Sequence, residues 1–257
     1  MSKQQLTNYI NQTTNDGKNL FIPYIMAGDG GLDQLKEQVL FLESCGVAAV
    51  ELGIPFSDPV ADGPTIQEAG IRSLNNKTTL KKVLQELQSF INERKVPIIL
   101  MTYINPIFKY GVDQFAKDCA IAGVSGVIVP DVPFEEESLI LNALKINNIA
   151  FIRLASLTST PDRLEKIAKQ SEGFLYAVSV TGTTGERADH QDRVYDYLKN
   201  LKKISSVPVL AGFGISNAKQ AQKMNDYCDG VIVGSSIVNL LHEKKYAEIE
   251  SLIKNSL

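Results

Sequence analysis

The sequence predicts an α/β protein that folds as a single (β/α)8 TIM barrel domain over residues 1–257, with an extra helix at the N-terminus. Short apolar runs rich in β-branched residues recur along the chain. They do not alternate with polar residues, as expected for parallel strands buried on both faces. A segment of helical periodicity follows nearly every run. Eight such units in a chain of this length favour a closed barrel over an open doubly wound sheet.

The predicted strands are these apolar runs. They cover residues 20–25, 47–52, 97–103, 126–130, 149–154, 174–179, 207–212 and 230–234. Pro23 argues against the first of them, because proline has no N–H for a strand ladder. The connection after the second strand is far longer than one helix needs, and the loop after the sixth strand is also extended. We expect additional structure in the first of these two connections.

The predicted helices carry apolar residues at a period near 3.6. In the segment 79–95 these residues fall on one face of a helix. The segments 34–46 and 112–123 end in Gly46 and Gly123, and glycine is suited to the left-handed residue that terminates a helix. The extra helix and the remaining ones are expected at residues 2–15, 135–146, 162–170, 191–204, 216–225 and 246–254.

Composition excludes several classes of function. The 26 basic residues are dispersed and balanced by 29 acidic ones, so no nucleic-acid-binding surface is expected. No apolar stretch is long enough to span a membrane, and the polar N-terminus lacks a signal sequence, which predicts a cytoplasmic protein. The three cysteines form no CxxC pair and the two histidines lie far apart. We therefore expect no metal site.

Three glycine-rich loops follow the last three predicted strands. They are TGTTGE (181–186), AGFGIS (211–216) and VGSSIV (233–238), and in the last of them Gly234 and Ser235 open a helical stretch. Glycine lets backbone N–H groups approach an anion, and a helix N-terminus adds a positive dipole end. Barrel enzymes often bind phosphate after strands seven and eight. The loops predict a phosphorylated substrate.

The second predicted strand ends in an acidic loop, ELGIPFSDPVADGP (51–64). Glu51 lies within an otherwise apolar strand, where burial raises a carboxyl pKa and suits it to proton transfer. Asp58 precedes a proline and fits a role in shaping the turn. Asp62 can either face the barrel mouth or cap the next helix. Asp131 is a further candidate at the mouth.

The absence of certain residues reduces the number of possible reaction types. No lysine lies within a predicted strand, which argues against a Schiff-base aldolase, and no cluster offers a metal site. Two carboxylates and a phosphate site remain, so proton transfer on a phosphorylated small molecule is expected. Residues near the mouth that could line a pocket for a flat apolar group are Tyr24, Phe56, Leu100, Tyr103, Phe108, Leu157, Tyr176 and Phe213.

Several motifs resemble the tryptophan synthase alpha chain family. They are PYIMAGD, ELGIPFSDPVADGPTIQ, MTYINPIFKYG, VIVPDVP and the three glycine loops in order. The resemblance covers nearly the whole chain. It implies a lyase of tryptophan biosynthesis that splits indole-3-glycerol phosphate into indole and glyceraldehyde 3-phosphate. The alternatives are another phosphate-binding barrel, such as a phosphosugar isomerase or an indoleglycerol phosphate synthase, and a subunit that mainly binds and activates a partner.

The resemblance also implies roles for individual residues. Glu51 matches the general acid/base and Asp62 matches the aspartate that contacts the indole N–H. The substrate-binding positions are Tyr24, Leu100 and Tyr103 for indole, Tyr176 beside the glycerol group, Gly185, Gly214, Gly234 and Ser235 for phosphate with Phe213 between two of them, and Thr184 on a mobile loop. Val180 stands where some members carry an arginine, which removes any closing contact of that side chain.

The family acts together with a beta chain. The resemblance implies an alpha2-beta2 heterotetramer in which the beta chain carries pyridoxal phosphate (PLP) and consumes the indole, while the chain itself needs no cofactor. The docking surface is expected on the mouth loops 53–62, 105–111 and 131–135.

Overall fold

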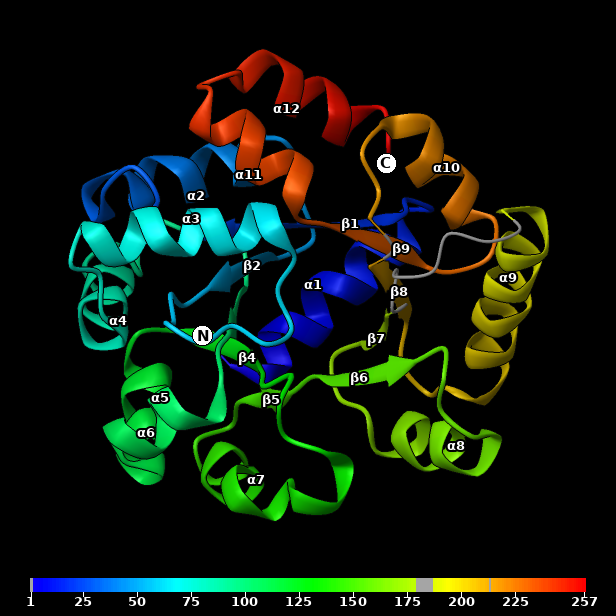
Figure 1. Ribbon diagram of the computed structural model, residues 1–257, viewed down its shortest axis with the longest axis horizontal. Helices are drawn as coiled ribbons and strands as arrows, with labels where there is room; N and C mark the ends of the chain where they lie inside the picture. The colour runs from blue at the N-terminus through cyan, green and yellow to red at the C-terminus, as the bar shows by residue number, and fades with distance from the viewer. Residues whose placement is uncertain (1, 179–186, 213) are drawn as a thin grey trace.

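Parallel strands form a closed barrel in the computed structural model, which describes residues 2–178, 187–212 and 214–257 (Figure 1). The strand order is β5-β4-β3-β2-β1-β9-β8-β7-β6. Strands β5 and β6 are two segments of one barrel strand, interrupted at Ile152, and they pair with β4 and β7 respectively. This divided strand therefore closes the ring, and the predicted eight-stranded barrel is confirmed.

The strands are short, and most are buried throughout. They are β1 (Leu20–Met26), β2 (Val50–Gly53), β3 (Ile98–Met101), β4 (Val124–Ile128), β5 (Ala150–Phe151), β6 (Arg153–Ser156), β7 (Leu175–Val178), β8 (Val209–Gly212) and β9 (Gly230–Val233). The predicted strand 126–130 begins two residues earlier in the structure, and the predicted strand 97–103 is trimmed at both ends.

Pro23 lies inside β1, although proline lacks a ladder donor. The strand pairs with β9 from Leu20 to Pro23 and with β2 from Tyr24 onward. The proline thus lies where the regular pairing with β2 has not yet begun. Its missing N–H is tolerated at that point, and Tyr24 is the first β1 residue in register with β2, opposite Glu51.

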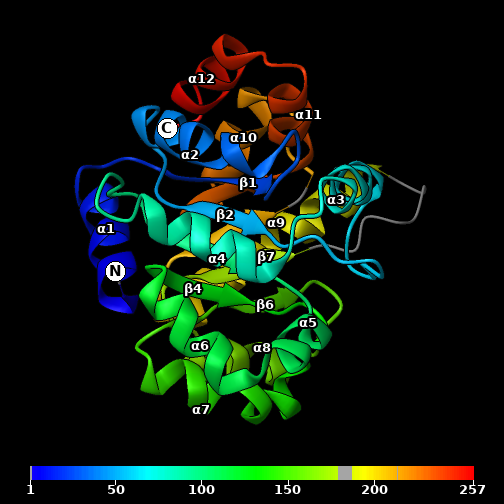
Figure 2. The same cartoon turned by 90° about the vertical axis from the view of Figure 1, so that its left-hand side faces the viewer.

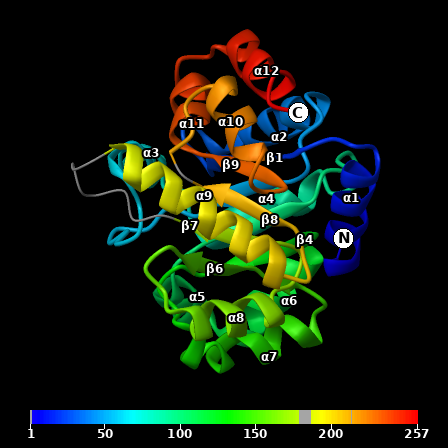
Figure 3. The same ribbon diagram turned by 90° about the vertical axis from the view of Figure 1, so that its right-hand side faces the viewer.

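Helices surround the barrel (Figures 1 and 3). In the described residues they are α1 (Lys3–Asn15), α2 (Leu35–Ser44), α3 (Pro64–Asn75), α4 (Leu80–Ser89), α5 (Ile104–Tyr110), α6 (Val112–Ile121), α7 (Ser138–Ile146), α8 (Pro161–Gln170), α9 (Arg187–Ile204), α10 (Ala218–Asn225), α11 (Ser235–His242) and α12 (Tyr246–Lys254). Short 3-10 turns η1 (Leu32–Gln34) and η2 (Phe134–Glu136) precede α2 and α7. The predicted helix 79–95 ends early, at Ser89, and the expected loop 105–111 is mostly helix.

Two additions to the basic barrel lie at its opposite ends (Figure 2). Helix α1 is the predicted N-terminal helix, and its Leu6 and Ile10 join the apolar cluster that fills the barrel interior. Helix α3 lies in the long connection after β2, where additional structure is expected from the length of that segment. Gly46 and Gly123, at the ends of α2 and α6, both have positive φ, as predicted for helix-terminating glycines.

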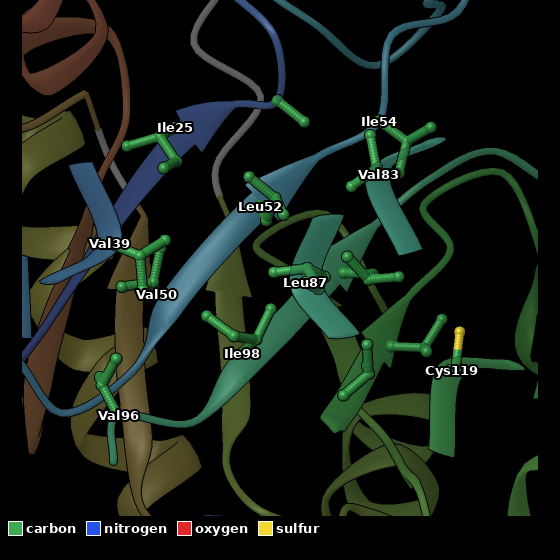
Figure 4. Close-up of a cluster of buried hydrophobic side chains, with 14 of the residues drawn as sticks. Ile25, Val39, Val50, Leu52, Ile54, Val83, Leu87, Val96, Ile98 and Cys119 are labelled. Atoms are coloured by element: carbon green, nitrogen blue, oxygen red, sulfur yellow. The ribbon is translucent and has the colours of Figure 1, made fainter. Parts of the chain in front are cut away.

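The side chains of each strand alternate between the barrel interior and the helix layer. In β2, Val50 and Leu52 pack outward in one large cluster with Val83 and Leu87 of α4 (Figure 4). Glu51 lies between them in the sequence and therefore points into the barrel. This alternation is what places an ionisable side chain inside an otherwise apolar core.

Candidate active site

A cavity of about 380 Å³ opens at the carboxyl ends of the barrel strands. Its walls come from β1, β2, β3, β7, β8 and β9 and from the loops that follow several of them. Both predicted catalytic carboxylates, Glu51 and Asp62, line it. Glu51 lies on β2 and Asp62 on the loop that follows the same strand, at the carboxyl end of the barrel, where the active face of a barrel is usually found.

Glu51 is held in a dry position at the bottom of this cavity. The residue is 1% exposed. Among the described residues, neither carboxyl oxygen has a hydrogen-bond partner. Burial, together with the smaller effect of the negative charge of Asp62, raises the pKa of Glu51 to about 8. An unpaired buried carboxyl group is costly to the fold and is typical of a functional site.

Asp62 lies at the cavity rim, on the loop between β2 and α3. Gly63 precedes α3 as the N-cap residue without a side-chain cap, so Asp62 does not cap this helix. The loop is held by Gln67, whose Nε2 donates to the Asp62 carbonyl at 2.7 Å. Partial burial raises the pKa of the Asp62 carboxyl to about 6, and a hydrogen bond with Tyr103 opposes part of that rise.

These two environments separate the carboxyl groups into an acid and an anion near neutral pH. With a pKa of about 8, Glu51 keeps its proton at pH 7. With a pKa of about 6, Asp62 has lost its proton at the same pH. A pair of titratable groups whose surroundings move them apart in this way indicates distinct acid and base roles.

Two tyrosines line the cavity, and each fills the space beside a glycine. A Cβ atom at Gly53 would overlap the Tyr24 hydroxyl, and one at Gly212 would overlap the Tyr176 ring. Burial is the first cause that raises the pKa of both phenols, and the charges of Glu51 and Asp62 add to it. The two hydroxyl groups therefore stay neutral and remain available as hydrogen-bond donors.

The far side of the cavity is built from the glycine loops after β8 and β9. Gly214 has φ +65°, a conformation that glycine adopts readily. Gly234 precedes α11, and Ser235 is the first residue of that helix. All three residues line the same cavity as Glu51. Unpaired N–H groups at a helix N-terminus beside an exposed glycine turn form a suitable anion site.

The structure brings together most of the site residues expected from the sequence. Those that line the cavity are Tyr24, Glu51, Asp62, Tyr176, Gly214, Gly234 and Ser235. Tyr103 lies beside them: its hydroxyl accepts a hydrogen bond from Ala61 N at 3.1 Å, and its ring lies 5.3 Å from that of Phe56. Thr184, Gly185 and Phe213, as well as Val180, lie outside the described residues.

Leu100 is placed elsewhere. It packs outward in the core between the barrel and the helices, and it is not among the described residues that line the cavity. Met101, the next residue on β3, faces the cavity instead. The alternation of strand side chains is the signal that could have located Met101. Other lining residues, which were not expected from the sequence, include Ile66, Ile215, Ser216, Ile232 and Ser236.

The described part of the chain contains no cluster of three or more His, Cys, Asp or Glu side chains that could hold a metal ion. None of its helices is both long and apolar enough to cross a membrane.

Comparisons with known proteins agree along almost the whole chain. Residues 10–257 match the family model described as "Tryptophan synthase alpha chain". A tryptophan synthase alpha chain from Oceanobacillus iheyensis is 58% identical over 257 residues, which is 100% of this chain and 98% of the relative. One from Bacillus mycoides is 50% identical over 93% of this chain and 92% of the relative. The crystal structure of tryptophan synthase subunit alpha from Legionella pneumophila superposes with a TM-score of 0.89 at 30% identity, covering 100% of this chain and 97% of that one.

Proposed function

The chain belongs to the tryptophan synthase alpha chain family, and from this premise we propose that Glu51 and Asp62 are the groups that carry out its reaction. The reaction is a carbon–carbon lyase reaction of tryptophan biosynthesis. It cleaves indole-3-glycerol phosphate into indole and glyceraldehyde 3-phosphate. The observation that supports the assignment best is the separation of the two carboxyl pKa values in one cavity.

The breaking bond needs an acceptor for its electrons. Many aldolases provide an imine or a metal ion, but protonated indole can accept the electrons itself. Addition of a proton to ring carbon C3 gives an indolenine in which the ring nitrogen carries positive charge. Glu51 is the proton donor in this proposal, because its carboxyl group is protonated at neutral pH and has no competing partner among the described residues.

Asp62 stabilises the positive charge that develops on the ring nitrogen. Its carboxylate is ionised at neutral pH and lies at the rim of a partly dry cavity, where charge interactions are stronger than in water. The hydroxyl of Tyr103 holds the same loop through Ala61. Asp62 therefore faces the ring nitrogen from a fixed position.

Glu51 completes the cycle as a base. Once its proton is on C3, its carboxylate takes the proton of the adjacent glycerol hydroxyl. The aldehyde forms, the carbon–carbon bond breaks, and the electron pair returns to the ring and neutralises the nitrogen. One proton is added and one is removed, so the reaction needs no net acid or base. Tyr176 lines the cavity, which supports its proposed contact with the glycerol group.

The phosphate of the substrate is proposed to bind at the glycine end of the cavity. Gly214, Gly234 and Ser235 offer main-chain N–H groups there. Gly185 and Phe213, with Thr184 on the loop after β7, remain proposed contacts on the basis of the resemblance. Tyr24 and Met101 are the proposed walls of the indole pocket, with Met101 taking the place expected for Leu100.

An alpha chain of tryptophan synthase has a beta chain as its partner. We propose that the two form an alpha2-beta2 heterotetramer in the cytoplasm, that PLP belongs to the beta chain, and that residues 1–257 work as one domain without a cofactor. A second cavity, of about 820 Å³, supports docking at the mouth loops. It lies between Pro55–Ser57 and the α5 residues Asn105, Pro106 and Lys109.

The competing barrel functions are not favoured by the family match. An indoleglycerol phosphate synthase would use a lysine in its pocket, and no lysine is among the described residues that line this cavity. The reading as a mainly partner-activating subunit is tested by rates of indole release. We expect the isolated chain to release indole from indole-3-glycerol phosphate and a beta chain to accelerate this release.

Two variants of one loop test the residue assignment in the isolated chain. Asp62→Asn removes the charge at the cavity and should lower turnover about 100-fold. Asp58→Asn is the matched control, because Asp58 is exposed on the same loop and does not line the cavity. Equal turnover of the two variants would remove Asp62 from the mechanism.

A further inference from the structure

We infer that Asp29 and Arg72 are positioning residues for the reaction: their ion pair fixes α3 on the loop after β1 and thereby holds Asp62 over the cavity. The inference rests on the proposed role of Asp62. Neither residue lines the cavity, so both act through other groups.

The contact between α3 and this loop consists of polar side chains on one part of the helix. Arg72 donates from Nε to Asp29 Oδ1 at 2.6 Å and from a terminal nitrogen to Oδ2 at 2.7 Å. Ser73 Oγ donates to the Ala27 carbonyl at 2.5 Å, and Asn76 Nδ2 donates to the Gly28 carbonyl at 3.0 Å. Three successive loop residues are therefore bound by the C-terminal part of α3 and its C-cap residue, Asn76.

The pair has the geometry of a fixed contact. A guanidinium group that binds both oxygens of one carboxylate sets the orientation as well as the distance. The Asp29 side chain is only 10% exposed, which limits competition from water. The hydrogen bond to Asp29 is the first cause that raises the pKa of Arg72. Arg72 therefore remains charged at every pH at which the enzyme works.

The loop itself is fitted closely to the helix. Gly28 has φ +78°, and a Cβ atom there would collide with the Thr78 side chain and touch Ser73 Oγ. Residue 28 must therefore be a glycine for the loop to lie against the end of α3 and the turn before α4. The segment 27–29 has little freedom to shift while these contacts exist.

This contact joins the elements that carry two proposed site residues. The loop follows directly from β1, which holds Tyr24 in the cavity. Helix α3 begins at Pro64, two residues after Asp62. A rotation or shift of α3 on the barrel would move Asp62 with it. The pair between Asp29 and Arg72 opposes such a shift from the far end of the helix.

The apolar contacts of α3 are too few to fix it alone. Its buried Ala69 belongs to a small cluster with Tyr24, Met26 and Val238, against which Ile66 packs. Helices α2 and α4 to α12 instead contribute to the much larger outer clusters. A small apolar contact resists sliding of α3 only weakly, because the hydrophobic effect has no preferred direction. The hydrogen bonds and the ion pair are directional, and they fix the position of the helix.

The test compares three variants of the full-length chain. Arg72→Gln removes the charge and the paired hydrogen bonds, and Arg72→Lys keeps the charge alone. Lys3→Gln is the matched control: it removes the 2.7 Å ion pair between Lys3 of α1 and Glu172, at the end of the barrel opposite α3 (Figure 2). We expect Arg72→Gln to lower kcat for indole release about tenfold or more, Arg72→Lys to recover part of it, and Lys3→Gln to leave it unchanged.

Two further readouts separate positioning from a general structural role. Affinity for glyceraldehyde 3-phosphate should stay the same in Arg72→Gln, because the glycine loops take no part in the hydrogen bonds between the end of α3 and residues 27–29. When Asp62→Asn is already present, adding Arg72→Gln should lower kcat little further, because the effect of Arg72 on kcat depends on Asp62. Equal losses in both backgrounds, or a fall in kcat that only follows the folded fraction, would overturn the inference.

The design keeps two failures apart. If Asp62→Asn alone keeps full turnover, the proposed function fails. If Asp62→Asn is impaired while Arg72→Gln behaves like the wild type, only the positioning role fails. Should Arg72→Gln not fold, Asp29→Asn replaces it in every comparison, because it removes the opposite charge of the same pair and leaves one acceptor oxygen. The same outcomes then decide.

Discussion

The ring of Tyr24 occupies the space in which residue 53 would carry its side chain. A Cβ atom added to Gly53 would overlap the phenol hydroxyl and its ring carbon. Gly53 follows Glu51 by two residues and faces the same side of β2. The small residue at position 53 therefore allows an aromatic side chain from β1 to lie beside the buried carboxyl group of β2.

Gly53→Ala should lower kcat/KM for indole release about tenfold or more, because the ring of Tyr24 must move into the cavity. The backbone of Gly53 does not have positive φ, so the effect is steric. Gly70→Ala is the control. Its added Cβ would meet only Met26, at 3.7 Å, and the helical position favours alanine. A Gly53→Ala enzyme with unchanged kcat/KM would contradict the tight fit.

The pH dependence of kcat/KM should be bell-shaped. The value of kcat/KM should rise through about pH 6 as Asp62 ionises. It should fall through about pH 8 as Glu51 of the substrate-free enzyme loses its proton. The substrate phosphate titrates at about pH 6 as well, so glyceraldehyde 3-phosphate binding is measured over the same range and its contribution divided out. Activity that stays constant from pH 7 to pH 10 would be inconsistent with a protonated Glu51.

Stability should depend on pH through Glu51. Its folded-state pKa of about 8 lies above that of a free glutamate, so the native protein holds a proton that the unfolded chain releases. The stabilisation from this proton is complete at acid pH and is lost as the pH rises toward 8. Glu51→Gln does not titrate. The free energy of unfolding is measured in urea for both proteins. The value for Glu51→Gln minus the value for the wild type should therefore increase between pH 5 and pH 8.5 by an amount on the order of a few kcal/mol. Parallel curves for the two proteins would rule this out.

Gly234→Val should weaken phosphate binding without unfolding the protein. A Cβ atom at Gly234 would make ordinary contacts, at 3.6 Å with Tyr24 and 3.8 Å with Ile66, so the surrounding side chains leave room for it. The valine methyl groups would extend into the glycine end of the cavity. The dissociation constant for glyceraldehyde 3-phosphate, measured by calorimetry, should rise about tenfold or more. An unchanged constant would remove Gly234 from the phosphate site.

The barrel could be predicted because its signals are local. Unbroken apolar runs and helical periods recur along the chain, and glycines with positive φ follow α2 and α6. The details that differ depend on contacts between distant parts of the chain. Pro23 is tolerated in β1 because pairing with β2 begins only at Tyr24, and the fifth barrel strand is divided at Ile152 into β5 and β6. The predicted helix 79–95 stops at Ser89 although its apolar period continues.

The candidate site was predictable to a similar degree. Glu51 could be found because a carboxylate inside an apolar strand conflicts with its surroundings. Leu100 and Met101 are both apolar neighbours on β3, and only the direction of the strand separates cavity from core. The pairing of Asp29 with Arg72 could not be found, since the two residues lie 43 positions apart and neither sequence neighbourhood indicates the other.

Proton donation by Glu51 is the central claim, and the turnover of Glu51→Gln tests it most directly. The variant keeps the size and shape of the side chain and lacks the transferable proton. Substrate binding is measured by calorimetry and indole release in a single turnover. We predict that Glu51→Gln binds indole-3-glycerol phosphate as the wild type does and releases no measurable indole. Indole release at a rate close to that of the wild type would contradict the account.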